Sequence, residues 1–451
     1  MATARPNLVI DSARRMLRHG AYRRVAHLME GMRPGDAAVF FESIAVDDRR
    51  KLAQLLHRDA LVHLLGALSV EVAAETFENM EDPDFVALIG RLPREDAAAV
   101  LRFLSAERRE GILARMDARA SDEVEELLAY PAGTVGAIMK PEAFALEESA
   151  TVTEAVEALQ RASDGGPIFY IYVTDKRGYL VGVVSYRMLL LARRDAPLGS
   201  IMKSDVSAVR AGEPQDEAAA VVSRYDLVAV PVVDEDHRLL GVVTVDNIVD
   251  LIQAKATEDL FKMAGLGSDD RVFCPPSRSI RKRLPWLFIN LLTAFLAASV
   301  VGLFQNTIQA AVILAVFMPI VAGMGGNAAT QTLTVVIRGL AIGEVTPRDA
   351  LRAILKEGSV NLAIGTILGA FMAVTALIYK GNPYLGFVLG AAMVCNMMVA
   401  GLAGAMIPLA LRVLKIDPAL ASGVIVTTFT DCCGFFSFLG LATLLISRLA
   451  T

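Results

Sequence analysis

Apolar residues recur along this chain with three different patterns, and each pattern predicts a different architecture. Up to about residue 130 they are spaced three and four apart, which predicts short amphipathic helices. From 138 to 252, strand-like runs alternate with helical ones. From Leu284 onward come five apolar stretches, each near or beyond the length that crosses a bilayer. We therefore expect a multidomain protein with an all-α part, an α/β part and a five-helix transmembrane part.

The N-terminal helical domain, expected over residues 1–130, contains an internal repeat. The segment Gly35-Asp36-Ala37-Ala38 returns about sixty residues later as Glu95-Asp96-Ala97-Ala98, and a proline precedes each copy. Short helices repeated in this way usually stack into a superhelix. Its charged residues are expected to form a solvated face of a scaffold rather than a catalytic site.

Residues 131–254 contain a second repeat, built from a strand, a turn, a strand and a helix. Each copy follows an Ile-Met-Lys segment, at 138–140 and 201–203, and each second strand leads through Gly-x-x-Ser/Thr into a helix. The strand-like runs lie at 167–173 and 178–185, and again at 230–234 and 239–244. This pattern resembles a tandem pair of CBS domains.

A connecting segment is expected over 247–275, where it overlaps the end of the second CBS-like repeat. Its first part, to Gly265, predicts an amphipathic helix. The apolar side of that helix would carry Ile248, Leu251, Ile252, Leu260, Phe261 and Met263. A basic run then precedes the first apolar stretch, with Arg278, Arg281, Lys282 and Arg283.

The membrane domain is expected over 276–451, with five spans at 284–305, 308–341, 357–379, 384–411 and 419–447. Basic residues gather before the first span and in the second-to-third and fourth-to-fifth loops, whereas the opposite side carries only Lys380 and Arg448. The positive-inside rule then places the N-terminus in the cytoplasm and the C-terminus outside. This orientation predicts a multi-pass protein of a bacterial inner membrane.

Charge and cysteine content sharpen this division. The chain has 8 basic and 5 acidic residues from Leu284 onward, whereas the first 283 residues carry a net charge of −8. An acidic first part gives no reason to expect a nucleic-acid partner. No secretory signal pattern opens the chain, so the soluble part is expected to stay in the cytoplasm. The four cysteines form no disulfide framework, since Cys432 and Cys433 are adjacent.

Asp431 is expected to be the one acid inside the spans. It lies in Thr427-Thr428-Phe429-Thr430-Asp431 of the fifth span, where a lone carboxylate is costly unless it meets water, an ion or a partner charge. No lysine or arginine of the spans is placed to pair with it. A protonated, hydrogen-bonded aspartic acid is the structural alternative. We favour a cation site on a wet path, with Thr428 beside it.

The second span is expected to contribute to the same path. Pro319 and the pair Gly325-Gly326 would loosen the helix so that backbone carbonyls approach the path, because irregular backbone at membrane depth persists where it lines a cavity or is buried in protein. Asn327, with Thr330 and Gln331 after it, would add neutral oxygen donors that suit a hard cation such as Mg²⁺. Tight helix packing through small residues is the alternative reading of the glycines. A symmetric dimer would bring two Asp431 carboxylates to one axis.

The order of these parts, with Gly-Gly-Asn in the second span and Thr-Asp in the fifth, resembles the MgtE family of magnesium channels. The resemblance implies a homodimer with its pore between two membrane halves. It also implies that Asp431 is the pore aspartate and that the helix from Asn247 to Gly265 is a plug. Mg²⁺ would be both the ion conducted and the cytosolic ligand that closes the pore. The regulatory ions would bind acids of the N-domain, the CBS pair and the plug helix, with Asp96, Asp216, Asp246, Asp250, Glu258 and Asp259 as candidates. Lys255 occupies a position where the family often has an acid.

Adenine nucleotide binding at the CBS pair is a separate expectation. CBS pairs that bind ATP usually have an aspartate three residues after the Gly-x-x-Ser/Thr residue, but this chain has Met188 and Asn247 there. Arg187 and Tyr170 remain the candidate contacts.

Three other functions compete with a magnesium channel. A CBS-bearing chloride channel would need more spans and usually carries its CBS pair after them. A CBS-regulated membrane enzyme would need clustered carboxylates or histidines in the spans, and no histidine follows His237. A secondary transporter of divalent cations such as cobalt or manganese would keep the fold but alternate access, and no inverted repeat is evident among the spans.

Overall fold

The computed structural model describes residues 6–78, 80–141, 143–162, 168–267, 276–341, 343–346 and 348–449. It divides the chain into two compact units, Met1–Lys255 and Ala256–Thr451, which are called here the first and the second unit. The end of the expected connecting segment, residues 268–275, lies outside the described residues, as does Pro167 of the first expected strand run.

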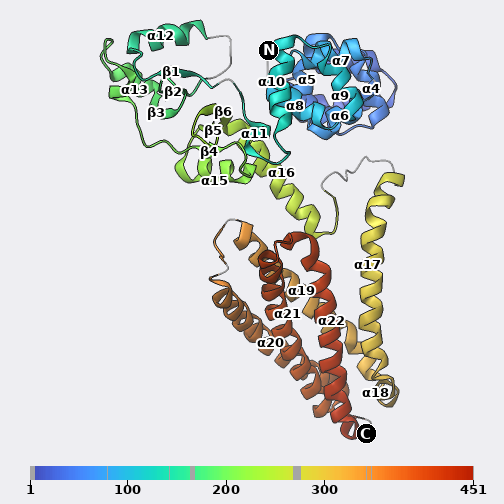
Figure 1. The fold of residues 1–451 in the computed structure, drawn as a ribbon. Coiled ribbons are helices and arrows are strands. Elements are labelled where there is room, and N and C mark those ends of the chain that lie inside the picture. Colours follow the sequence, from blue (N-terminus) through green and yellow to red (C-terminus); the bar gives the residue numbers. More distant parts are fainter. Residues whose placement is uncertain are drawn as a thin grey trace. The chain divides into compact units, whose positions relative to one another are not determined.

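The first unit begins with a two-layered stack of short helices (Figure 1). Apart from the contact between α1 and α2, odd-numbered helices pack mainly against odd-numbered ones and even-numbered helices against even-numbered ones, so each successive pair adds one step to a superhelix, as the internal repeat predicted. The helices are α1 (Pro6–Arg18), α2 (Tyr22–Glu30), α3 (Pro34–Glu42), α4 (Val46–Ala53), α5 (Arg58–Ala67), α6 (Val70–Phe77), α7 (Asp82–Ile89), α8 (Arg94–Arg102), α9 (Ala106–Leu113) and α10 (Ala118–Ala129).

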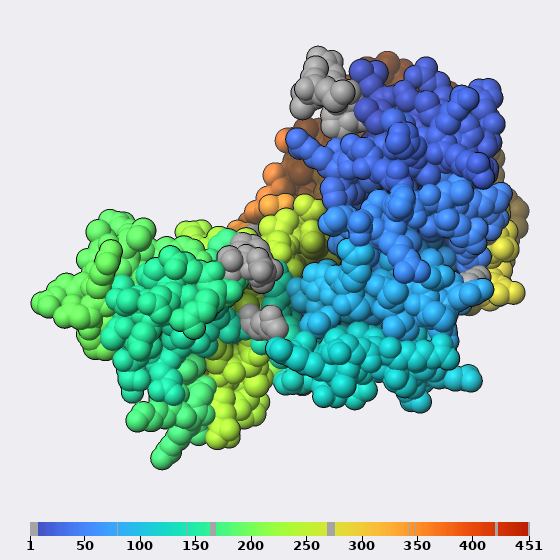
Figure 2. All heavy atoms as spheres, turned by 90° about the horizontal axis from the view of Figure 1, so that it is seen from above, coloured from blue at the N-terminus to red at the C-terminus, as the bar shows by residue number. Residues whose placement is uncertain are grey.

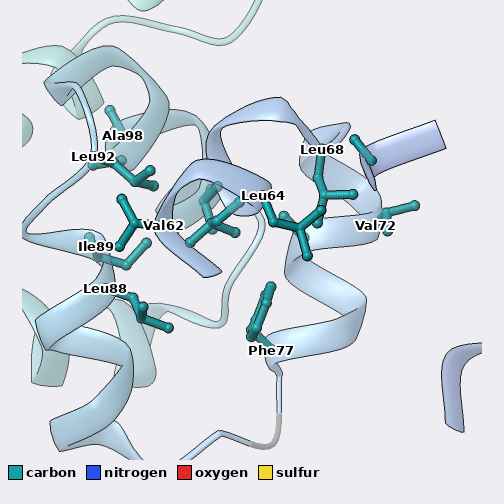
Figure 3. Packing of buried hydrophobic residues seen from close by; sticks show 14 of the residues in the cluster. Val62, Leu64, Leu68, Val72, Phe77, Leu88, Ile89, Leu92 and Ala98 are labelled. Atoms are coloured by element: carbon teal, nitrogen blue, oxygen red, sulfur yellow. The ribbon is translucent and has the colours of Figure 1, made fainter. Parts of the chain in front are cut away.

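Apolar side chains from consecutive steps interlock between the two layers. Figure 3 shows Leu64 of α5 and Phe77 of α6 pointing toward the same interior, with Leu88 and Ile89 of α7 beside them. The alanine pairs of the repeat are buried in both copies, at 37–38 and 97–98. Small side chains at these positions let the helices approach closely, which explains why the repeat keeps them.

The second part of this unit consists of two three-stranded sheets with helices around them. In each sheet the first strand is parallel to the second and the second is antiparallel to the third. The elements are α11 (Val135–Ile138), β1 (Ala145–Glu147), α12 (Val152–Arg161), β2 (Tyr170–Thr174), β3 (Leu180–Ser185), α13 (Tyr186–Leu191), α14 (Leu198–Ile201), β4 (Val209–Arg210), α15 (Gln215–Tyr225), β5 (Ala229–Val233) and β6 (Leu239–Thr244). The two copies therefore fold alike, as a CBS-like pair should.

Each Ile-Met-Lys segment pairs with the sheet of the other repeat. Lys140 exchanges two backbone hydrogen bonds with Val242 of β6, at 2.8 and 2.9 Å, and Lys203 exchanges two with Val183 of β3, both at 3.0 Å. A side chain at Gly241 would place its Cβ 2.4 Å from the Lys140 carbonyl oxygen, so only glycine lets the crossing segment lie this close. The glycine of the Gly-x-x-Ser/Thr motif thus joins the repeats. Figure 2 shows the helical stack and the CBS-like pair as adjoining lobes of the first unit.

The predicted amphipathic helix is present as α16 (Val245–Met263), which begins in the first unit and ends in the second. Beyond its last turn Gly265 adopts a positive φ of 70°, and the amide of Leu266 donates to the carbonyl of Phe261 at 2.8 Å. A left-handed glycine with this hydrogen bond is a common helix terminator.

In the described part of the second unit, five helices are long and apolar enough to cross a membrane (Figure 1). They are α17 (Pro276–Gly302), α19 (Ile313–Ala341), α20 (Ala350–Lys380), α21 (Pro383–Val413) and α22 (Pro418–Leu444), with short helices α18 (Gln305–Ala310) and α23 (Ile446–Leu449). Helix α21 contacts α19, α20 and α22 and contributes more buried residues than any other helix of this unit, whereas α17 packs mainly against α22.

The expected second span, 308–341, is wrong at its start. Residues Gln305–Ala310 form the separate helix α18, and Ala311 leaves helical geometry at φ −139° and ψ 78° before α19 begins at Ile313. The sequence is uniformly hydrophobic through this break, so the break could not be predicted. Hydropathy indicates burial in lipid and does not indicate the direction of the backbone.

Candidate functional site

The second unit contains a cavity of about 340 Å³ that is lined in part by polar groups. Four elements line it: the end of α16 with the residue after it, and the helices α17, α19 and α22. The polar lining consists of Asn290 and Thr293 from α17, Thr330 from α19, and Thr427, Thr428 and Asp431 from α22. Met263, Ala264 and Trp286 provide much of the apolar boundary. This cavity is the candidate ion site of the membrane spans.

Helical spacing explains why the α22 residues share one face. Val424, Thr427, Thr428 and Asp431 are separated by three and four positions, so their side chains follow one another along the helix. The hydroxyl of Thr428 donates to the carbonyl of Val424 at 2.6 Å, and that of Thr427 donates to the carbonyl of Gly423 at 2.9 Å. Each hydroxyl oxygen keeps lone pairs after donating. The wall therefore presents a carboxylate and neutral oxygens, which is the donor chemistry of a hard cation.

One chain alone supplies too few acids to strip a divalent ion of its water. Among the described residues, no cluster of three or more His, Cys, Asp or Glu side chains is placed to hold a metal. Magnesium dehydrates reluctantly and commonly keeps several waters in protein sites. A cavity of this volume with one carboxylate suits a hydrated ion better than a bare one.

The predicted residues of the second span are separated by the structure. Thr330 lines the cavity, but Asn327 and Gly326 do not, and Asn327 is exposed on the surface of the single chain. The helix α19 also continues through Pro319 and the paired glycines without a break, so the expectation of a loosened helix is wrong. The carbonyls of this stretch take part in the hydrogen bonds of the helix and are therefore not available to bind an ion.

Gly325 serves close packing against a residue that the sequence did not single out. A Cβ at Gly325 would lie 2.2 Å from the side-chain nitrogen of Asn396, and one at Gly434 would lie 2.8 Å from it. Asn396 of α21 is fully buried and donates to the carbonyl of Val321 at 2.7 Å. Its side-chain oxygen has no partner among the described residues. In the sequence, the position of Asn396 within an apolar span was the available indication of a buried polar contact.

The spans contain a second acid, so the expectation that Asp431 stands alone is wrong. Glu357 of α20 is 6 % exposed, accepts from the hydroxyl of Thr332 at 3.3 Å, and meets the ammonium of Lys356 at 2.5 Å. Asn361 donates to the same hydroxyl at 3.0 Å. These groups join α19 to α20 inside the bundle. The expected start of the third span at residue 357 hid this, because α20 begins seven residues earlier, at Ala350.

The acids expected to sense cytosolic magnesium fall into three groups in the structure. In the first unit, Lys140 lies 3.2 Å from Asp246 and 3.9 Å from Glu95, a buried acid that the sequence reading passed over. Burial raises the pKa of Glu95 to about 7 and that of Asp96 to about 6, despite the nearby ammonium. The charges of Asp246 and Asp250 raise the pKa of Asp96 further. This group combines several carboxylates with one lysine.

The other two groups also include a lysine. Lys255 lies 3.7 Å from Asp216 and so pairs with one of the expected sensor acids. In the second unit, Lys262 lies 2.6 Å from Glu258 and 2.7 Å from Asp417. Burial lowers the pKa of Lys262, but the hydrogen bonds to Asp417 and Glu258 outweigh it, and the pKa is raised overall. Asp259 is half-buried next to Glu258 on α16.

The nucleotide candidates lie on the first CBS-like repeat. Arg187 is exposed on α13, and Tyr170 is half-buried at the start of β2 with its ring centroid 6.4 Å from that of Tyr172. Asn247, at the position of the expected ribose contact, donates its side-chain amide to the carbonyl of Ile138 at 3.1 Å. That residue therefore takes part in the packing of the domain.

Comparison with known families agrees with the division of the chain into a helical N-terminal part, a CBS-like pair and a membrane part. The chain matches the profile of the MgtE intracellular N domain over residues 32–133, of the CBS domain over 135–195 and 198–254, and of the divalent cation transporter MgtE over 318–441. It is 34 % identical over 441 residues to the magnesium transporter MgtE of Thermus thermophilus, covering 96 % of this chain and 98 % of the relative. The chain belongs to the MgtE family of magnesium transporters.

A second relative supports the same membership. The magnesium transporter MgtE of Bacillus subtilis is 32 % identical over 435 residues, with 96 % of each chain covered. Among solved structures, the cytosolic domain of the Mg²⁺ channel MgtE in complex with ATP is 31 % identical, with a TM-score of 0.49 over 54 % of this chain and 99 % of that one. Membership in the MgtE family makes the protein a membrane transporter with a cytosolic N-terminal domain, and makes magnesium its substrate. It is not an enzyme.

Proposed function

We propose that this protein is a magnesium-selective channel whose pore lies between two copies of the chain. The supporting observation is the position of Asp431 on a polar cavity within the five-helix unit. Asn327 is exposed on the single chain, and a Cβ at half-buried Gly326 would meet nothing within 4 Å. A second copy on a two-fold axis would add a second Asp431 carboxylate, and two carboxylates suit a hydrated divalent ion better than one.

We further propose that cytosolic magnesium closes this pore by binding the acids of the N-domain, the CBS pair and α16. Closely spaced carboxylates repel one another until a cation screens them, so ion binding favours the arrangement that brings them together. Asp96, Asp246 and Asp250 form such a group in the first unit. In the second unit, Glu258, Asp259 and Asp417 border the end of α16, whose Met263 lines the cavity of Asp431.

The lysines distinguish this sensor from one made of acids alone. Lys140, Lys255 and Lys262 each place an ammonium group where a divalent ion would otherwise neutralise carboxylates. Part of the repulsion is therefore relieved without magnesium. Closure in this chain should need fewer ions than an all-acid sensor would. ATP at the CBS pair stays a prediction, with Arg187 as the exposed cation that would meet a phosphate.

The test is magnesium influx into liposomes that contain the purified full-length protein and an internal fluorescent indicator. We expect influx that falls when magnesium is raised on the side of the cytosolic domain. The variant in which Asp250, Glu258 and Asp259 are all alanine should conduct but close less at high magnesium. If correctly inserted wild-type protein shows no influx in either condition, the channel proposal is wrong. Influx that saturates at a low turnover and exchanges one divalent ion for another would instead indicate a carrier.

A further inference from the structure

A second groove in the membrane unit lies where the C-terminal ends of α19 and α21 meet the N-terminal end of α20. Its volume is about 230 Å³, below the size of typical small-molecule sites. Seven of its eight lining residues are apolar, among them Leu340, Ile354, Met406 and Leu409, and the eighth is Arg412. This groove shares no lining residue with the cavity of Asp431.

Arg412 is an exposed cation without a carboxylate partner among the described residues. It lies in the last turn of α21, and no ion pair or side-chain hydrogen bond joins its guanidinium to another described residue. The same end of the bundle is rich in exposed basic residues, with Arg338, Arg348, Arg352 and Lys415 against the acids Glu344 and Asp349. The guanidinium of Arg412 at this end of the groove would therefore pair with an anion.

Position in the membrane decides what kind of anion fits. Basic loops face the cytoplasm, so this end of the helices lies at the cytoplasmic surface of the bilayer. Arg412, in the last turn of α21, is therefore at the end of the span that meets the headgroup region. Basic pockets between membrane helices at this level bind anionic lipid headgroups.

We propose that this groove binds one anionic phospholipid of the cytoplasmic leaflet. Arg412 holds the phosphate, and one acyl chain lies against Leu340, Ile354 and Leu409. A second copy of this chain fits the groove less well, because an apolar interface there would bury the guanidinium without a partner charge. A phospholipid offers a phosphate to the guanidinium and an acyl chain to the apolar wall.

The experiment is a titration of delipidated full-length protein with phosphatidylglycerol or phosphatidylcholine, followed by native mass spectrometry that counts bound lipids. We expect tighter binding of phosphatidylglycerol to the wild type. Arg412→Gln should weaken that binding on the order of fivefold, as expected for loss of one basic contact. Arg412→Lys should keep most of it. Arg348→Gln is the matched control, since Arg348 is exposed at the same end but does not line the groove, and it should bind as the wild type does.

A second variant tests the apolar wall. Ala410 is an exposed lining residue, so Ala410→Phe fills the groove without changing charge and should reduce binding of both lipids. Equal binding of the two lipids by the wild type, or full phosphatidylglycerol binding by Arg412→Gln, would overturn the proposal. So would a shift from dimer to monomer in Ala410→Phe with lipid binding unchanged, because that result would assign the groove to a contact between copies. Because Arg412→Gln alters an exposed side chain, it tests the proposal even if Ala410→Phe does not fold.

Discussion

The ammonium group of Lys262, in the last turn of α16, lies 2.7 Å from a carboxylate oxygen of Asp417, the N-cap residue of α22. The other carboxylate oxygen of Asp417 accepts from the amide of Ala419 at 2.9 Å, so one side chain both caps the fifth span and holds the end of α16. Glu258, one turn earlier on α16, is the second partner of the lysine at 2.6 Å. The next residue after Lys262, Met263, lines the cavity of Asp431. The ion pair therefore fixes the helix end that borders the candidate pore.

Replacing Lys262 with methionine should make closure depend more strongly on magnesium. Without the ammonium group, Glu258 and Asp417 repel each other until a divalent ion takes its place. We expect larger influx than in the wild type at low cytosolic magnesium, and closure that is restored at high magnesium. Lys380→Met, at the opposite end of the helices, is the control. A Lys262→Met channel with unchanged magnesium dependence would show that the ion pair does not contribute to gating.

Replacing Asp431 with alanine should lower magnesium influx at least tenfold, since a carboxylate interaction with a divalent ion in a partly desolvated site exceeds 1.4 kcal/mol. The helix should stay folded because Asp431 borders a cavity and does not fill a packed interface. Thr428→Val, one turn away, keeps the shape but removes a neutral oxygen, and its effect should be smaller. Influx assays on both variants, with thermal unfolding as a check on folding, make the comparison. Normal influx in Asp431→Ala would remove this residue from the pore.

Gly325→Ala and Gly326→Ala should behave differently although the residues are neighbours. The new Cβ at 325 would meet the Asn396 side chain at 2.2 Å, whereas at 326 it would meet nothing of the same chain within 4 Å. Overpacking of this kind typically costs about 1–3 kcal/mol. We expect a lower unfolding temperature for Gly325→Ala only. If Gly326→Ala instead lowers the dimer fraction, that result would place Gly326 at the contact between copies.

Magnesium sensing by the first unit should weaken as the pH falls through the range from 7 to 6. Burial raises the pKa of Glu95 to about 7 and that of Asp96 to about 6, so protons compete with magnesium for these carboxylates in that range. The same shift has a consequence for stability. Because the pKa of each acid is higher in the folded protein than in the unfolded chain, their charged forms destabilise the fold, and this cost appears as the pH rises from about 4 to about 7.

Glu95→Gln tests both effects. Glutamine keeps the size but cannot ionise, so at pH 8 we expect greater stability of the variant, by about 3 kcal/mol for a shift of this size. At pH 4.5 the two proteins should be equally stable. Chemical unfolding of wild type and variant at both pH values, with magnesium absent, measures the difference. Glu107→Gln, on an exposed turn of α9, is the matched control. Equal stability at pH 8 would mean that the charged form of Glu95 costs nothing in the folded protein, so that its pKa is not raised there.

Local patterns were sufficient to predict most elements of this fold. The repeat with alanines at 37–38 and 97–98, the two CBS-like copies and the α16 helix were all readable, because burial of one face imposes a period on neighbouring residues. The five spans were also predicted, with errors at their ends such as the missed helix α18. Hydropathy averages over a window, so it locates a span better than it locates a turn.

The sequence by itself determined where the apolar segments lie and which acid of the fifth span, Asp431, needs a polar surrounding. A charged residue within an apolar segment can be recognised from its neighbours along the chain. Only the tertiary structure decided that Gly325 packs against Asn396, that Glu357 is buried with Thr332, and that Lys262 meets Asp417. These pairs join residues that are 71, 25 and 155 positions apart. Their free energy depends on distance and desolvation between helices, and no pattern along one helix carries that information.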